Sequence, residues 1–260
     1  MDIAKKHAAF IIALIAFFSL SVSAVLTDTA SAETKLRAPR LTNHASGSKS
    51  IRNTWTKVKG ADGYEIFRSG EKGKKYKKVK TITSGKTLSW NNKKLKTNRS
   101  YYYQVRAYQK DGSDKVYGNF SAGQWAVPTN QPNWAYSISG KSKKTRTVKV
   151  TFTNKSRYSM VFEKQGAYLT GAKAVKKWES KPAQQWHDME NTQLKAAGIY
   201  PAEMKKKITI KPGQKAVLQY KTKIAAQYTK NGYLASDFTH HKKKYGVLHS
   251  YKKGSRIWLY

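Results

Sequence analysis

One stretch, residues 95–108, constrains the fold more than any other part of this 260-residue chain. Its second half reads YYYQVRAY, and a two-residue period places Tyr101, Tyr103 and Val105 on one face of a strand. Leu95 precedes Tyr101 across a short polar turn. A leucine, a polar corner and a tyrosine that opens a strand predict that the tyrosine hydroxyl bonds back to upstream backbone. We therefore expect a β-sandwich in the first half of the chain.

Three further motifs accompany this corner: WTKVKGADGYEIFRS at 55–69, LSWNNKKL at 88–95 and VYGNFS at 116–121. Together they make residues 35–128 resemble a fibronectin type III domain, of the lysine-rich kind found in secreted proteins of Gram-positive bacteria. The resemblance implies a sandwich of seven short strands, the first around Leu36, and structural roles for four residues: Trp55, Trp90, Leu95 and Tyr101. Asn53 stands where the family usually has an aliphatic core residue, so we expect it to find a hydrogen-bond partner or to lie at a sheet edge.

The first 32 residues predict a signal peptide. Two lysines lead an apolar run, and Ala30-Ser31-Ala32 has the small residues of a cleavage site before Glu33. The alternative is an uncleaved membrane anchor, because the run approaches spanning length. No later stretch is apolar enough to span a bilayer, and the chain has no cysteine. We expect an exported chain without disulfides, held together by its hydrophobic cores.

The second half, 134–260, follows a polar linker at 129–133 and again reads mostly as strands. The pattern predicts a hairpin at 207–220 around Pro212-Gly213, and a strand pair at 245–251 and 256–260. Residues 171–204 contain helix formers, which predict a helical insertion. This half is loosely similar to Ig-like accessory domains of bacterial exported proteins. The predicted fold class is all-β, with a fibronectin type III sandwich followed by an Ig-like sandwich that carries the insertion.

The strongest compositional signal is charge. The chain has 51 basic and 14 acidic residues, a net charge of +37, and the excess is spread over both halves. Such a surface favours an anionic partner, although solubility alone and charged protection of an edge strand are the simpler explanations. The candidate polymer-binding residues are Lys72, Lys74, Lys75, Lys77, Lys78, Lys80, Lys141, Lys143, Lys144, Arg146, Lys242, Lys243 and Lys244.

Aromatic residues beside the lysines are candidates for stacking on sugar rings or bases. Strand alternation does not require Trp178, Trp186, Tyr200, Tyr102, Tyr108 or Trp125 to be buried. The simpler interpretation of Trp178 and Trp186 is that they pack the inserted helix against its sheet.

Catalytic and metal-binding signatures are weak. His240, His241 and His249 are near one another in sequence, but adjacent strand residues point to opposite faces, and no cysteine or carboxylate stands at ligand spacing. The sequence has neither a G-x-S-x-G nor an H-E-x-x-H motif. We expect no catalytic residues, metal or cofactor.

The sequence thus predicts a secreted, cell-wall-associated, non-catalytic protein that binds an anionic wall or matrix polymer such as teichoic acid. Polysaccharide is a further candidate ligand, and nucleic acid would bind only nonspecifically. Two alternatives remain open: a glycan-active enzyme with an accessory fibronectin type III domain, and a module that binds another secreted protein.

Overall fold

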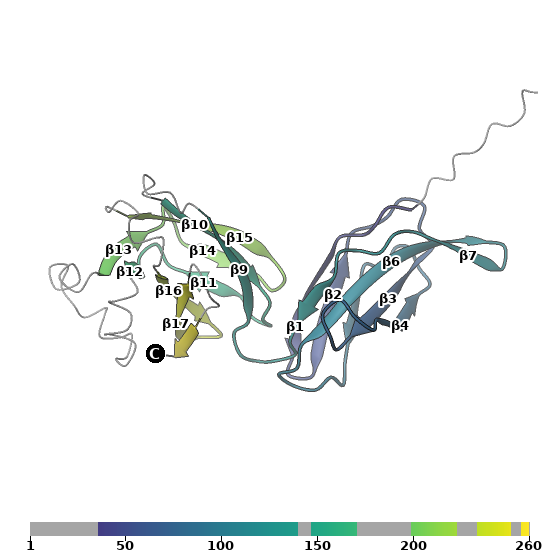
Figure 1. Ribbon diagram of the computed structural model, residues 1–260, viewed down its shortest axis with the longest axis horizontal. Coiled ribbons are helices and arrows are strands. Elements are labelled where there is room, and N and C mark those ends of the chain that lie inside the picture. The colour runs from purple at the N-terminus through teal and green to yellow at the C-terminus, as the bar shows by residue number, and fades with distance from the viewer. Residues whose placement is uncertain (1–35, 140–146, 171–198, 223–232, 251–255, 260) are drawn as a thin grey trace, which may run out of the picture.

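The computed structural model describes residues 36–139, 147–170, 199–222, 233–250 and 256–259 (Figure 1). Every regular secondary-structure element in these ranges is a β-strand, and all the strand pairs are antiparallel. This confirms the predicted all-β class. The strands form two groups, one from 41–126 and one from 134–259, which follow each other along the long axis (Figure 1). The predicted signal peptide at 1–32 and residues 171–198 of the predicted insertion lie outside the described residues.

The first group packs a three-stranded sheet against a five-stranded sheet. Its strands are β1 (Leu41–Gly47), β2 (Ser50–Trp55), β3 (Gly63–Ser69), β4 (Lys77–Ile82), β5 (Ser89–Asn92), β6 (Tyr101–Asp111), β7 (Asp114–Tyr117) and β8 (Gln124–Ala126). One sheet has the order β1-β2-β5, and the other has the order β4-β3-β6-β7 with β8 also paired to β6. With the first, second and fifth strands in one layer and the others opposite, this is a fibronectin type III-like fold.

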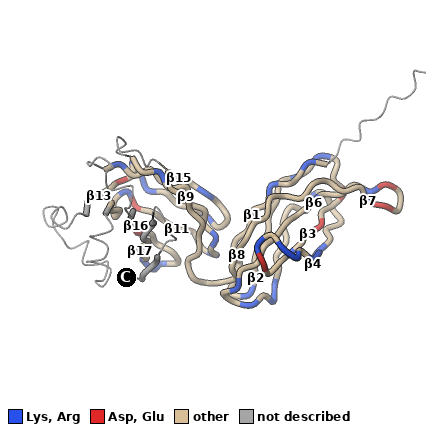
Figure 2. The backbone as a smooth tube through the Cα atoms, in the orientation of Figure 1, with Lys and Arg blue, Asp and Glu red and all other residues tan. Residues whose placement is uncertain are grey.

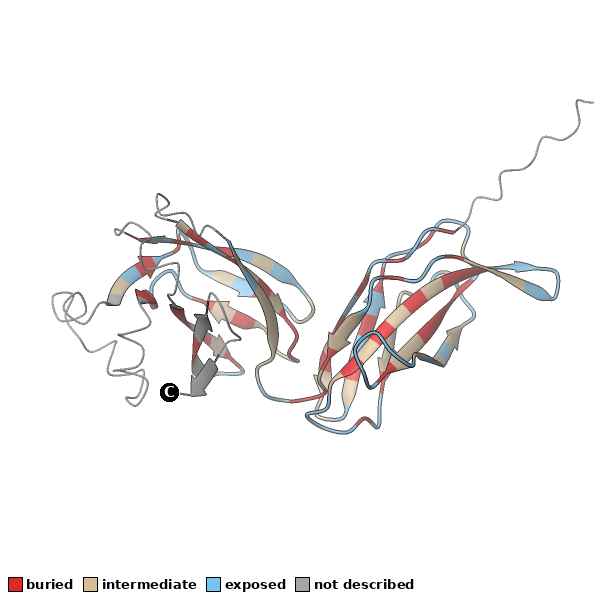
Figure 3. Cartoon of the chain, viewed as in Figure 1, coloured by how far each residue is buried: buried red, intermediate tan, exposed pale blue. Residues whose placement is uncertain are grey.

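The long strand β6 shows how the sequence produces this packing. Burial alternates along it (Figure 3). Tyr103 and Val105 are fully buried between the sheets, whereas Tyr102 and Arg106, on the other face of the strand, are half-buried. At its start, the backbone N–H of Lys96 donates to the Tyr101 hydroxyl at 3.0 Å. This bond closes the polar corner before the strand.

The two ends of this sandwich differ from the sequence prediction. The first strand is β1, and Leu36 is instead a buried core residue outside any strand. Residues 115–128, which the strand pattern predicts as one last strand, are divided into β7 and β8, with Gly118 between them. A Cβ on Gly118 would lie 2.5 Å from the Leu36 carbonyl oxygen. Only glycine therefore permits the backbone at residue 118 to approach the backbone at Leu36 this closely.

Asn53 contradicts our expectation of a partner or an edge position. It lies in β2, the central strand of the three-stranded sheet, and is fully buried. Neither its side-chain oxygen nor its side-chain nitrogen has a hydrogen-bond partner. Its neighbours in register are Asn43 on β1 and Trp90 on β5. An unpaired buried carboxamide destabilises the sandwich relative to an aliphatic residue.

The ten strands of the second group all belong to one continuous sheet. Its strands are β9 (Trp134–Ser139), β10 (Thr147–Asn154), β11 (Met160–Phe162), β12 (Ala167–Thr170), β13 (Ile199–Glu203), β14 (Ile208–Ile210), β15 (Lys215–Thr222), β16 (Tyr233–His240), β17 (Lys243–Ser250) and β18 (Arg256–Leu259). The main order is β14-β11-β16-β12-β13-β15-β10-β9, and β17 joins β16 to β18. The predicted pairing of the last two strands is confirmed.

Residues 199–203, which lie inside the predicted bounds of the insertion, form strand β13, and the rest of the predicted insertion up to residue 198 lies outside the described residues. One expectation for this half is wrong. Residues 207–220 do not form a hairpin, because β14 pairs with β11 whereas β15 pairs with β10 and β13. The turn between them does have type II character, since Gly213 has a φ of 76° and the Gln214 N–H donates to the Lys211 carbonyl at 3.0 Å. It acts as a corner between two parts of the sheet.

Candidate binding surface

The loop between β3 and β4, together with the first half of β4, carries the densest group of lysines that the structure describes. We call the exposed set Lys72, Lys74, Lys75, Lys77, Lys78 and Lys80 the lysine hairpin. The Ser69 hydroxyl fixes the turn by donating to the Lys74 carbonyl and accepting the Glu71 N–H at 2.9 Å. Positive φ values at Gly73 and Lys75 reverse the chain. The sequence therefore builds a tight turn that projects its lysines into solvent.

A second exposed basic turn, between β16 and β17, contains Lys242, Lys243 and Lys244. His241 and Lys242 have φ values of 49° and 65°, as a two-residue hairpin turn requires. Basic residues are distributed over both strand groups (Figure 2). The predicted cluster of Lys141, Lys143, Lys144 and Arg146 lies outside the described residues.

Glu65 is the buried counter-charge of the five-stranded sheet. Its carboxylate accepts from Lys78 at 2.9 Å and from Arg106 at 2.8 Å, and the Lys115 ammonium lies 3.8 Å away. Burial acts to raise the pKa of Glu65, but the hydrogen bonds from Arg106 and Lys78 outweigh it and hold that pKa below its ordinary value. The carboxylate is thus ionised and satisfied inside a basic surface.

Beside Glu65, aromatic rings surround Arg106. Its guanidinium carbon lies 3.6 Å from the Tyr117 ring centre, 5.1 Å from that of Phe120 and 5.3 Å from that of Phe67. Phe120 is 41% exposed. The two-residue period of β6 places Arg106 on the face opposite Tyr103 and Val105. It does not indicate these neighbours, because they come from other strands and a loop.

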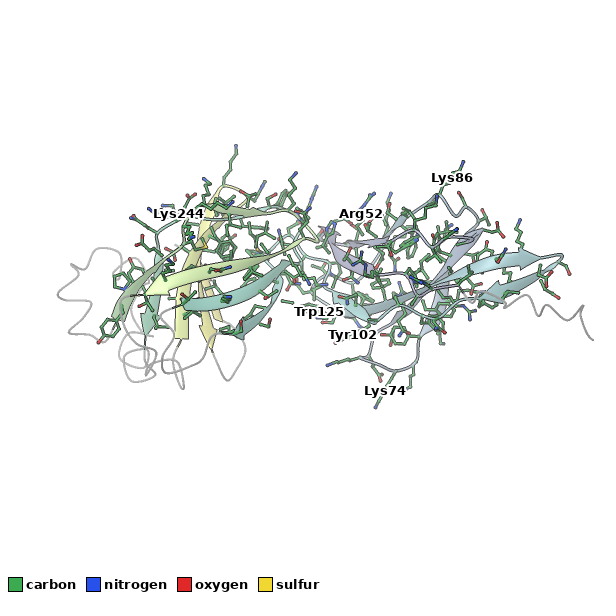
Figure 4. The ribbon with its side chains drawn as sticks, turned by 90° about the horizontal axis from the view of Figure 1, so that it is seen from above. Arg52, Lys74, Lys86, Tyr102, Trp125 and Lys244 are labelled. Atoms are coloured by element: carbon green, nitrogen blue, oxygen red, sulfur yellow. The ribbon has the colours of Figure 1, made fainter. Side chains whose placement is uncertain are left out.

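A further aromatic group lies on the outer face, where β6 begins. The strand register places Trp125 of β8 directly opposite Tyr102 of β6, and both are half-buried. Tyr76, also half-buried, has its hydroxyl 3.2 Å from where a Cβ on Gly123 would lie, next to β8. We call Tyr76, Tyr102 and Trp125 the aromatic row. Figure 4 shows Tyr102, Trp125 and Lys74 along one side of the sandwich, whereas Arg52 and Lys86 lie along the other.

The remaining stacking candidates differ in burial, and two of them lie outside the described residues. Tyr108 is only 1% exposed, and its hydroxyl donates to the Ile82 carbonyl at 3.3 Å, so its prediction as a stacking residue is wrong. Tyr108 pairs in register with Gly63, whose missing side chain leaves room for the tyrosine ring. Tyr200 is half-buried in β13. Trp178 and Trp186 lie outside the described residues.

The residues given structural roles lie in or against the first core. Trp55 is 3% exposed and packs on Tyr64, with ring centres 5.4 Å apart. Leu95 is buried in the same cluster, and the half-buried Trp90 packs against it.

Lys155 is a site that sequence reasoning missed. It follows β10 and is buried against the first sandwich, where its ammonium contacts the side-chain oxygen of Asn43 at 3.1 Å and that of Gln124 at 3.5 Å. The Trp125 ring centre lies 5.7 Å away. Burial lowers the pKa of Lys155 to about 8. Lysines in loops are usually solvated, so the sequence offered no signal for a buried one.

The loop that presents Lys155 is itself well ordered by hydrogen bonds. The Asn154 side chain donates to the carbonyls of Tyr158 and Ile210, each at 2.8 Å, and accepts the Ser156 N–H at 2.9 Å. On the other side, the Ala45 N–H donates to the Lys155 carbonyl at 2.9 Å. The two sandwiches are therefore joined by backbone and side-chain contacts as well as by residues 129–133.

The three histidines that are near one another in sequence, His240, His241 and His249, do not form a metal site in the described part of the chain. His240 is buried between the rings of Tyr158 and Tyr245, His241 lies in the turn, and His249 pairs in register with Leu234. Among the described residues there is no group of three or more His, Cys, Asp or Glu side chains that could hold a metal ion.

Comparisons with known proteins bear on the fold alone. No protein-family model matches the chain, and no curated protein matches its sequence. Among solved structures, the crystal structure of FN3tt is 20% identical, covers 36% of this chain and 96% of its own, and has a TM-score of 0.30. The fn3 domain of human contactin 1 is 22% identical, with coverages of 41% and 82% and a TM-score of 0.31. The FN1-FN3 domains of chicken CNTN1 are 12% identical, with coverages of 86% and 68% and a TM-score of 0.32.

The description of the first sandwich as fibronectin type III-like therefore rests on its own strand order and tyrosine corner. Within the described ranges, no helix is long and apolar enough to cross a membrane.

Proposed function

We propose that this chain is an exported, non-catalytic binding protein of the cell envelope or extracellular matrix, and that it binds an anionic glycopolymer of the teichoic acid type. The observation that carries the proposal is the lysine hairpin. Lys72, Lys74, Lys75, Lys77 and Lys80 are all exposed, and none forms an ion pair with an acid in the described residues. This unpaired positive charge is matched to a polyanion.

The chemistry of lysine favours a polymer over a small planar ligand. An ammonium group is a compact, hydrated charge on a flexible stem, which suits repeated phosphate or sulfate groups without fixed geometry. The predicted signal peptide and the resemblance to lysine-rich domains of secreted Gram-positive proteins favour a wall polymer as the source of that charge. The internal acid Glu65 does not compete for such a ligand, since its carboxylate is buried and paired.

Binding to purified cell walls tests the proposal. Wild-type protein is incubated with walls that contain or lack their anionic polymer, across a salt series. We expect retention that requires the polymer and falls steeply with salt, because the Debye length shrinks from about 10 Å at 0.1 M to about 3 Å at 1 M. Binding that ignores both salt and removal of the polymer would contradict the proposal.

A matched pair of variants separates the hairpin from overall charge. Lys72, Lys74, Lys75 and Lys77 are changed to Glu in one variant, which spares Lys78 and its bond to Glu65. The control changes the exposed residues Lys57, Lys59, Lys86 and Lys93 to Glu, so that both variants have the same net charge. We expect the hairpin variant to lose wall binding and the control to retain most of it.

A protein partner is the second candidate function, and the rings around Arg106 favour it. Exposed phenylalanine beside an arginine that is packed between aromatic rings is typical of protein interfaces. Phe120→Ala should then abolish the capture of a secreted protein while leaving wall binding intact.

A further inference from the structure

The aromatic row and the lysine hairpin are adjacent because of strand register. Tyr102 of β6 has Trp125 opposite it on β8 and Ser69 opposite it on β3. Ser69 is the residue whose hydroxyl fixes the lysine hairpin. Neighbouring strands are about 4.8 Å apart, so a line across the sheet runs from Trp125 through Tyr102 to the base of the hairpin over about 10 Å. Tyr76 lies within the lysine hairpin, directly before β4 begins.

Each ring in this row is half-buried, and the exposed ammonium groups of the lysine hairpin lie at one end of the row. At the other end Lys155 lies 5.7 Å from the Trp125 ring centre, but it is buried and hydrogen-bonded to Asn43 and is therefore not a contact for a ligand. No acidic side chain belongs to the row. Figure 4 shows Trp125, Tyr102 and Lys74 on the same side of the sandwich. Half-buried rings beside the exposed ammonium groups of the hairpin offer stacking and charge attraction to a single ligand.

We infer that the aromatic row is a stacking platform for the sugar rings of an anionic glycopolymer, whose phosphate groups bind the lysine hairpin. This inference rests on the proposed function and assigns to that function a specific site. The polarised C–H groups on one face of a sugar ring pack against the negative face of an aromatic ring. Rings in line with the hairpin allow one polymer segment to use both kinds of contact.

The charge of the neighbouring residues and the predicted export of the chain both favour the sugar rings of an anionic polymer as the ligand of the aromatic row. The neighbouring lysines select a polyanion, which makes a neutral glycan the poorer ligand. Among polyanions with flat rings, single-stranded nucleic acid could stack on the same residues, but an exported protein encounters wall and matrix polymers. The test therefore includes nucleic acid as a competing occupant.

Two forms of one polymer isolate the contribution of stacking. Poly(glycerol phosphate) with glycosyl substituents offers rings and charge, whereas the unsubstituted polymer offers similar charge without rings. Binding of each is measured by calorimetry for the full chain and its variants, with a single-stranded oligo(dT) as a third probe. Thermal unfolding checks that each variant is folded.

We expect Tyr102→Ala and Tyr76→Ala each to weaken binding of the glycosylated polymer by at least about fivefold, the lower end of the loss when one stacking ring is removed. Binding of the unsubstituted polymer should be unchanged. Tyr102→Phe keeps the ring and should bind like wild type. Phe120→Ala, an exposed aromatic on the same sandwich outside the row, is the matched control and should also bind like wild type.

The outcomes separate this inference from the proposed function. If both alanine variants bind the glycosylated polymer normally while reversal of the hairpin charges abolishes binding of both polymers, the row is not the site and the proposed function stands. If the alanine variants lose only oligo(dT) binding, the row stacks bases and the sugar assignment is wrong. If the wild-type chain binds neither polymer, the proposed function fails and this inference with it.

Discussion

The two sandwiches bury ionisable side chains in opposite ways. In the first, Glu65 is completely buried and stays charged, because Lys78, Arg106 and Lys115 surround its carboxylate. In the second, His240 is 1% exposed, and neither ring nitrogen has a hydrogen-bond partner. Burial, together with the neighbouring His241, lowers the pKa of His240 to about 4. One sandwich pairs its buried charge, and the other keeps its buried group neutral.

This difference teaches how a chain of such positive charge can fold. When basic residues are abundant, a buried acid has many possible ion-pair partners, and Glu65 forms ion pairs with basic residues from three strands. A buried base finds no spare acid and must remain uncharged among aromatic rings. Lys155, at the junction, is the intermediate case, since neutral oxygens of Asn43 and Gln124 surround its ammonium. The two sandwiches should therefore respond differently to mutation and to pH.

The largest effect should come from Trp55→Ala in the first core. Removing a ring that is 3% exposed leaves a cavity, and we expect a loss of about 3 to 5 kcal/mol in the free energy of unfolding. Hydrogen exchange resolved by strand should show faster exchange in β1–β8. Equal acceleration in β10 and β15 would show that the two sandwiches unfold as one unit.

Glu65→Gln should be the next in size. It removes the charge that three basic side chains share, and we expect a destabilisation of about 2 to 3 kcal/mol, because Lys78 and Lys115 can turn to solvent. Denaturant unfolding at pH 7 measures the effect. A neutral result would mean that the ion pairs contribute little to the first sandwich.

A pH titration should distinguish the sandwiches directly. His240 binds a proton at about pH 4 when folded and at its ordinary 6.5 when unfolded, so the free energy of unfolding of the second sandwich falls as pH drops from 6.5 to 4. We expect a loss of about 2.5 kcal/mol over this window, because each unit of pKa difference corresponds to about 1.4 kcal/mol. Glu65 has a lowered pKa, so its stabilisation is present above its ordinary value of 4.5 and is lost only below it. The second sandwich should therefore weaken first.

The matching control for this titration is His240→Phe, which fills the same space without a titrating group. Strand-resolved hydrogen exchange at pH 7, 5.5 and 4.5 would follow both sandwiches in one sample. Persistence of the full pH dependence in this variant would rule out His240 as its cause.

Asn53→Val should stabilise the first sandwich by about 1 kcal/mol. The substitution replaces a buried carboxamide that lacks partners with an aliphatic side chain of similar size. A rise in the midpoint of thermal unfolding measures it. A fall would indicate that the carboxamide is satisfied by water.

Lys155→Met should have the smallest effect on stability, about 1 kcal/mol or less, because loss of the hydrogen bonds is offset by relief from burying a charge. Its effect should appear in the junction instead. Small-angle scattering should show a broader distribution of shapes than for wild type, with Lys221→Met, an exposed lysine of β15, as the control. Identical profiles would show that Lys155 does not hold the sandwiches together.

Local sequence determined most of the first sandwich. The alternation of YYYQVRAY, the leucine-to-tyrosine corner and the Trp55 motif depend on neighbours a few residues apart, and the structure places Tyr103, Leu95 and Trp55 in one core. The exposed lysines were also predictable, because charge alone excludes them from a core. The Pro212-Gly213 turn was readable for the same reason, since its geometry is set by those two residues.

Only the tertiary structure decided which residues meet. The pairing of Tyr102 with Trp125, the rings around Arg106 and the contacts of Lys155 each join residues far apart in the chain. A period in one strand carries no information on its register with another. The same reason explains the wrong hairpin at 207–220: a turn fixes how the chain bends, but sheet pairing chose β11 for one arm and β10 and β13 for the other. The sequence thus determined strands, turns and charge, and long-range pairing determined which side chains lie together on the proposed binding surface.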